Sequence, residues 1–83
     1  MSRPKPNYDA ALQAAAHLLG DDDQPALRVL ADRLRLNIAN HAEYGWTQDV
    51  VAGRVDAILD LNRLLTTRGW PSFDRLVIDA ERP

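Results

Sequence analysis

The residue types that carry most enzymatic and metal chemistry are scarce in this chain, and their spacing forms no catalytic motif. There is no cysteine, and His17 and His41 fall in different predicted helices without an HExxH spacing. A metal site needs three or four convergent ligands, so we interpret both histidines as structural residues. Ser2 lies in the N-terminal arm, and Ser72 stands where a helix cap is expected. We therefore expect a protein that is not an enzyme and that binds no metal ion or cofactor.

Three consecutive aspartates, Asp21 to Asp23, form the densest group of potential ligands. A calcium loop places its ligands at alternate residues and ends on a glutamate, and this segment has neither feature. A turn followed by the cap of a helix that begins near Pro25 accounts for the same residues, because aspartate is preferred at helix N-termini. The sequence therefore predicts a cap here and no ion site.

The composition indicates one small globular domain, residues 1–83, with a flexible N-terminal arm at residues 1–6. Hydrophobic residues make up 46% of the chain, which is too many for a disordered protein. A net charge of −2, with both signs interspersed, argues against an electrostatic grip on nucleic acid or on an anionic membrane. No long apolar run follows the arm, so we expect no membrane segment and a cytoplasmic location. The arginine-, alanine- and leucine-rich composition suits a GC-rich bacterial or phage genome.

Apolar spacing and helix-end signals predict an all-α fold, a small antiparallel helical bundle of three main helices and a short C-terminal helix. The predicted spans are about 8–19, 25–44, 48–68 and 73–80. The expected caps are Asn7, Thr47 and Ser72, and the expected terminators are Gly20, Gly45 and Gly69. Residues 76–78 also suit a strand, but no second strand exists to pair with it. Because the second and third helices are long and their connection is short, we expect them to form an antiparallel hairpin.

The predicted third helix is unusually apolar around its circumference. At roughly 100° per residue, well over half of its surface is covered by Val50, Val51, Val55, Ala57, Ile58, Leu59, Leu61, Leu64 and Leu65. Such a helix must be covered on at least two sides. A core of this size supplies only a few kcal/mol, and no disulfide can add to it. We therefore predict that a protein partner, most simply a second copy in a homodimer, covers the excess.

Two polar residues, Arg54 and Asn62, fall inside the apolar arc of the third helix. An unpaired buried charge is very costly, so Arg54 must meet a carboxylate or reach water along its stem. One interpretation is a stem packed on the core with the charged head at its edge. The other is that Arg54 and Asn62 line an interface and set its register, as single polar residues do in coiled coils.

A second candidate contact surface lies on the predicted second helix. Val29 and Leu36 form a narrow apolar strip nearly opposite the main stripe, and Arg33 borders it. Trp46, at the tip of the hairpin, directly follows the terminating Gly45. The residue after such a glycine folds back onto the last helical turn, so Trp46 is either a helix staple or an interface hot spot. Val29, Leu36 and Trp46 together are the best candidates for partner contact.

These observations favour a small non-enzymatic protein–protein interaction module. We expect an adaptor, inhibitor or regulator, of the type found among phage and plasmid accessory proteins, that occludes a surface of its partner. The alternative is a nucleic-acid-binding helical regulator that uses its basic N-terminal arm and arginine-rich helix faces. The arginines of that alternative are Arg28, Arg33, Arg35, Arg63 and Arg68. Aspartates interspersed among them weaken it.

Overall fold

The structure, a computed structural model, describes residues 7–45 and 47–81. These residues form four α-helices: α1 (Tyr8–Leu18), α2 (Gln24–Tyr44), α3 (Gln48–Thr66) and α4 (Phe73–Glu81). A single 3-10 turn, η1 (Asp21–Asp23), precedes α2, and no strand occurs within the described ranges. The prediction of an all-α bundle is confirmed, including a helix over the segment that also suited a strand. The predicted arm and Trp46 lie outside the described residues.

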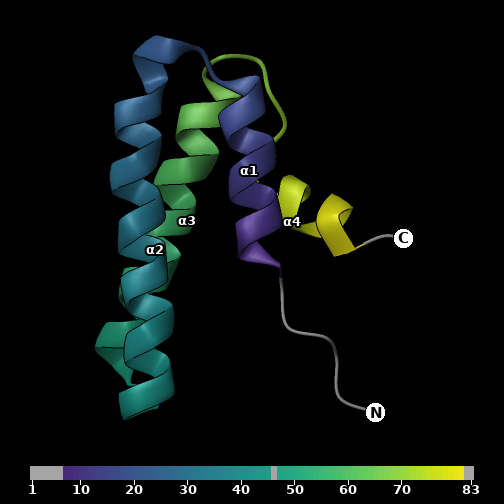
Figure 1. Cartoon of the computed structure of the whole chain (residues 1–83). Helices are drawn as coiled ribbons and strands as arrows, with labels where there is room; N and C mark the ends of the chain where they lie inside the picture. The colour runs from purple at the N-terminus through teal and green to yellow at the C-terminus, as the bar shows by residue number, and fades with distance from the viewer. Residues whose placement is uncertain (1–6, 46, 82–83) are drawn as a thin grey trace.

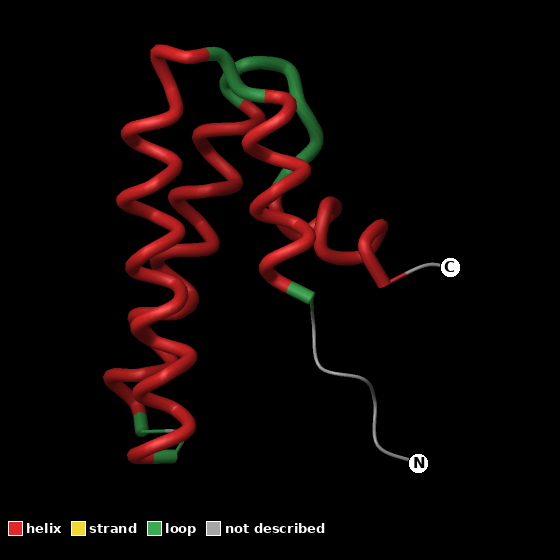
Figure 2. The backbone as a smooth tube through the Cα atoms, viewed as in Figure 1, coloured by secondary structure: helices red, strands yellow, loops and turns green. Residues whose placement is uncertain are grey.

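The α2–α3 hairpin is the central element of the fold. The two helices run side by side over most of their length, while α1 packs on one side of the pair and α4 packs against α1 and α3 (Figures 1 and 2). Gly53 of α3 lies against Asn37 of α2, since a Cβ at this position would come within 2.3 Å of the Asn37 amide oxygen. This close approach explains a glycine inside a helix, where it otherwise costs about 1 kcal/mol.

Side chains begin three of the helices as the sequence predicts. The Asn7 side chain accepts a hydrogen bond from the Ala10 amide at 3.0 Å, and the Thr47 hydroxyl accepts one from Val50 at 3.2 Å. The Ser72 hydroxyl accepts one from Arg75 at 3.2 Å. Each bond satisfies a backbone donor that has no partner inside its own helix. The three predicted caps are confirmed.

Two of the three predicted glycine terminators are confirmed. Gly45 and Gly69 have φ angles of 77° and 83°, a left-handed conformation that suits glycine. After α3, the Trp70 amide donates to the Leu65 carbonyl at 3.1 Å and the Gly69 amide donates to Thr66 at 3.0 Å. These two bonds make up a Schellman motif, which ends α3 at the predicted terminator Gly69.

The prediction that Gly20 terminates α1 through this conformation is wrong. Gly20 has a φ of −75°, and α1 ends because Leu19 is already extended. The Gln24 side chain, at the start of α2, donates to the Ala16 carbonyl at 2.9 Å and to the Leu19 carbonyl at 3.0 Å. A residue of the next helix therefore satisfies carbonyls that the last turn of α1 leaves open.

The prediction of an aspartate side-chain cap for α2 is also wrong. Asp23 stands at the N-cap position but makes no side-chain cap bond. Its carboxylate instead accepts two hydrogen bonds from Arg68, one from Nε and one from Nη2 at 2.6 Å. The hairpin brings the end of α3 beside the first turn of α2, and a bidentate guanidinium is a stronger partner than a backbone amide.

Apolar residues of all four helices meet in one core. Its fully buried members are Ala11, Ala15, Leu34, Ala57, Leu61, Leu65 and Phe73. The rings of Tyr8 and Phe73 stack with centroids 6.2 Å apart and planes at 11°, which ties α1 to α4. No polar or charged residue among the described ones is buried. In this part of the chain, no helix has the length and apolar character that a membrane crossing needs.

The apolar surface of α3 is only partly covered. Val50, Ala57, Leu61 and Leu65 are buried, whereas Val51, Ile58 and Leu64 are half-buried. Val55 and Leu59 remain 43% and 55% exposed. The helix is thus covered on two sides, as the sequence requires, and its third side still carries apolar side chains toward solvent.

Candidate interaction surface on the α2–α3 hairpin

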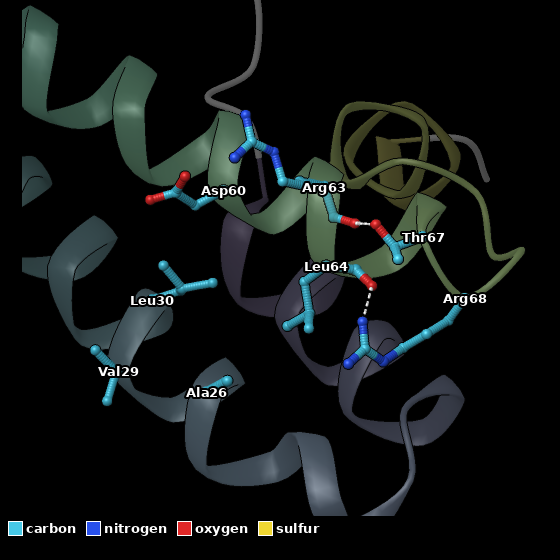
Figure 3. Close-up of a pocket in the computed structure, with 8 residues that line it drawn as sticks. All are labelled: Ala26, Val29, Leu30, Asp60, Arg63, Leu64, Thr67 and Arg68. Carbon is cyan, nitrogen blue, oxygen red and sulfur yellow. Dashed lines mark hydrogen bonds between the residues drawn. The ribbon is translucent and has the colours of Figure 1, made fainter.

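An open apolar hollow lies between α2 and α3 of the hairpin, and we call it the hairpin groove. Ala26, Val29 and Leu30 form its α2 wall and Leu64 its α3 wall, around a volume of about 520 Å³. Figure 3 shows Leu30 and Leu64 on opposite walls. Charged and polar side chains make its rim: Asp60, Arg63, Thr67 and Arg68. The groove therefore has an apolar floor and a polar border, the usual anatomy of a protein-binding surface.

The groove opens on the side of the hairpin away from α1. Leu27 and Ala31 line the contact between α1 and α2 together with Leu12 of α1. Val29 is two residues from each, so at 100° per residue its side chain points to roughly the opposite side of α2. We call this side of α2 and α3, which includes Val29 on α2 and Arg63 and Leu64 on α3, the hairpin face.

Helical spacing adds Leu36 to the hairpin face, because it follows Val29 by seven residues, almost two full turns. Val29 is 60% exposed and Leu36 is 62% exposed. Arg33 lies between them and donates to the Asp60 carboxylate at 3.1 Å. Both partners are roughly half exposed, so this ion pair contributes little to stability. It does fix α2 and α3 to each other at the middle of the face.

Two further charged side chains of the hairpin face are available to pair with a binding partner. Asp56 and Arg63 are exposed residues of α3, and neither makes an ion pair or side-chain hydrogen bond with any residue that the structure describes. Arg68, at the end of the groove, is already held by Asp23 and by the Leu64 carbonyl. The face thus offers Arg63 as an open cation and Asp56 as an open anion beside its apolar groove.

The structure brings together three of the six candidate residues from the sequence, namely Val29, Arg33 and Leu36. Arg54 lies on another side of α3, half-buried, with a buried Nε. It borders a separate hollow of about 240 Å³ with Tyr8, Ile58 and Asp74. The packed-stem interpretation agrees with this position, and a role of Arg54 in an interface stays a prediction. Trp46, the remaining candidate apart from Asn62, lies outside the described residues.

Asn62 joins α3 to the start of α4. Its amide nitrogen donates to the Asp74 carboxylate at 2.9 Å, and its amide oxygen accepts from the Asp74 backbone at 3.0 Å. The two bonds fix the first turn of α4 on α3 and satisfy one of the open donors of that helix. This arrangement gives Asn62 an intramolecular task on the apolar arc, so we do not include it in the contact surface.

Asn62→Ala should therefore loosen α4. We expect a loss of about 1 kcal/mol in unfolding free energy, since each net hydrogen bond contributes about 0.5–1.5 kcal/mol and these bonds are exposed. The Asp74 amide should also exchange its hydrogen faster. Urea unfolding and amide exchange by NMR measure the two effects. Asn40→Ala on α2 is the matched control, because Asn40 makes no side-chain hydrogen bond in the described structure. Equal effects from the two variants would contradict the assignment.

The residues of the hairpin face that the sequence analysis did not single out include Ala26, Leu30, Asp56 and Asp60. The four-residue spacing of Asp56, Asp60 and Leu64 was visible in the sequence, but the neighbouring helix and its level were not. No group of three or more histidine, cysteine, aspartate or glutamate side chains in the described ranges is placed to hold a metal ion. No protein-family model, no curated protein and no solved structure matches the chain.

Proposed function

We propose that this protein is a small non-enzymatic protein–protein interaction module, and that the hairpin face is its contact surface. Such a module works as an adaptor, inhibitor or regulator by covering a surface of its partner. The observation that carries the proposal is the open apolar groove with Val29 and Leu36 exposed on the same face. We further propose that it acts in the cytoplasm, because a chain without cysteine needs no oxidising compartment.

The energetics of this face suit a specific contact. Fully burying a valine or leucine side chain is worth about 1.5–3 kcal/mol, and more than half of that is still available at Val29 and Leu36. Interfaces typically depend on a few such anchors surrounded by a polar rim. Arg63 and Asp56 supply charges that a partner can pair with at the border.

The shape of the groove indicates the chemistry of the partner. A trough between two antiparallel helices accepts a third helix that lays an apolar stripe into it. The open charges Arg63 and Asp56 require that this helix carry an acidic residue near one end of the stripe and a basic residue near the other. The partner is therefore a helical protein surface with both charge signs, and not a strongly basic or strongly acidic one.

The nucleic-acid alternative has less support in this arrangement. Arg33 is paired with Asp60, Arg35 with Asp9 and Asp32, and Arg68 with Asp23. A guanidinium that already holds a carboxylate is less available to a phosphate. Only Arg28 and Arg63, of the five arginines that the alternative invokes, make no such pair in the described structure.

Selection from a displayed library of amphipathic helical peptides tests the proposal. Peptides that bind the wild-type protein should shift the NMR signals of Ala26, Val29, Leu30 and Leu64. Val29→Asp should weaken their binding at least about tenfold, equivalent to 1.4 kcal/mol. Ile78→Asp on α4 is the matched control, because Ile78 is an exposed apolar residue away from this face. Binding to a DNA duplex that falls steeply with added salt would instead support the nucleic-acid alternative.

A further inference from the structure

The hairpin face carries two pairs of complementary residues with the same spacing. On α2, Val29 and Leu36 are exposed apolar residues seven positions apart. On α3, Asp56 and Arg63 are exposed, oppositely charged residues that are also seven positions apart. Seven residues of helix rise by about 10.5 Å and return to nearly the same side. Each pair therefore lies along its helix on the hairpin face.

The centres of the two pairs lie at the same level of the hairpin. The midpoint of Val29 and Leu36 falls between residues 32 and 33, and the midpoint of Asp56 and Arg63 falls between residues 59 and 60. The Arg33–Asp60 bond of 3.1 Å joins α2 and α3 at this level. A line on the hairpin face that crosses α2 and α3 at this ion pair therefore passes midway between Val29 and Leu36 and midway between Asp56 and Arg63.

We propose that the partner of the hairpin face is a second copy of this chain, related by a two-fold axis that lies just outside the face and parallel to this line. The inference rests on the proposed function, since it names the partner of the same face. An axis in this direction turns each helix antiparallel to its own copy. It places Val29 against Leu36 of the other copy and Arg63 against Asp56 of the other copy, and it makes each contact twice.

Charge complementarity selects this arrangement. The antiparallel alignment pairs Arg63 with Asp56 of the other copy, whereas a parallel alignment would set Arg63 against Arg63 and Asp56 against Asp56. Arg33 and Asp60 face each other within one copy, so the centre of the interface has no net charge.

A charge-swap series tests the axis. Sedimentation equilibrium of the wild-type protein, from micromolar to millimolar concentration, should show a monomer–dimer equilibrium. Asp56→Arg and Arg63→Asp, made singly, each set like charges opposite each other twice per dimer, and each should weaken the dimer at least about tenfold. The double variant restores both pairs and should return the dissociation constant to within about threefold of wild type. Circular dichroism verifies that all variants keep their helix content.

Cross-linking tests the register independently, because the natural chain contains no cysteine. A mixture of Val29→Cys and Leu36→Cys chains should oxidise mainly to the mixed disulfide dimer, and each variant alone should cross-link much less. Ile78→Cys on α4 is the control and should not cross-link. Predominant Val29→Cys homodimers would overturn the antiparallel register.

The outcomes separate this inference from the proposed function. A wild-type chain that stays monomeric at millimolar concentration overturns the second copy as partner. Helical peptides that still bind at Val29 would then leave the interaction function intact. A dimer that neither single charge variant weakens overturns the axis. A dimer that the single variants weaken and the double variant restores supports the axis, whatever the peptide selection finds.

Discussion

Phe73→Ala should remove most of the stability of this domain. Phe73 is completely buried, and its ring stacks on Tyr8 at a centroid distance of 6.2 Å. Truncating a buried phenylalanine typically costs about 3–5 kcal/mol, because the lost apolar contact and the cavity both count. The total free energy of unfolding of a small helical domain without a disulfide is of the same order. Urea unfolding followed by circular dichroism should show a chain that is largely unfolded, or close to it, without denaturant.

Ile78→Ala is the matched control for this prediction. Ile78 lies on the same short helix, α4, but its side chain is 48% exposed. Its truncation should change the unfolding free energy by less than about 1 kcal/mol, as for most surface positions. Similar losses from both variants would mean that α4 contributes through its helix content and not through the packing of Phe73 against α1.

A matched pair of leucines on α2 should separate the core from the hairpin face. Leu34 is completely buried, and Leu36 is 62% exposed only two residues away. Leu34→Ala should lower the unfolding free energy by about 2–5 kcal/mol. Leu36→Ala should change it by no more than about 0.5 kcal/mol in the monomer. It should weaken any association through the face, because it removes an apolar anchor from the contact.

Two measurements distinguish these effects for the leucine pair. Thermal unfolding at low protein concentration reports the stability of the single chain. Sedimentation at high concentration, or binding of a selected helical peptide, reports the face. A large loss of monomer stability in Leu36→Ala would show that Leu36 is packed within one chain, and it would remove this residue from the proposed contact surface.

The helix ends illustrate what local sequence can determine. Asn7, Thr47 and Ser72 cap their helices through bonds to an amide three residues later. Gly45 and Gly69 end helices in a conformation that glycine tolerates best. These interactions involve near neighbours in the chain, so their energies are almost independent of how the helices are arranged. Residue order alone therefore predicts them.

The wrong predictions concern hydrogen bonds that were expected from near neighbours in the sequence and that residues of another helix make instead. Asp23 suits a cap, but Arg68, which is 45 positions further along, binds its carboxylate. Gly20 suits a terminator, but Gln24 of the next helix satisfies the end of α1. Asn62 also has a distant partner, since Asp74 of α4 binds both polar atoms of its amide, and a role of Asn62 in an interface stays a prediction. Each outcome depends on which helix packs beside which.

The sequence by itself determined that this chain is an all-α bundle, where its helices begin and end, and that α3 is too apolar for one neighbour. These properties follow from patterns among residues that lie close together in the chain. Only the tertiary structure decided that Val29, Leu36, Asp56 and Arg63 share one face. Their grouping depends on the rotation of α2 and α3 about their axes and on the level at which Arg33 meets Asp60. Core packing sets both quantities, and no local pattern in the chain encodes them.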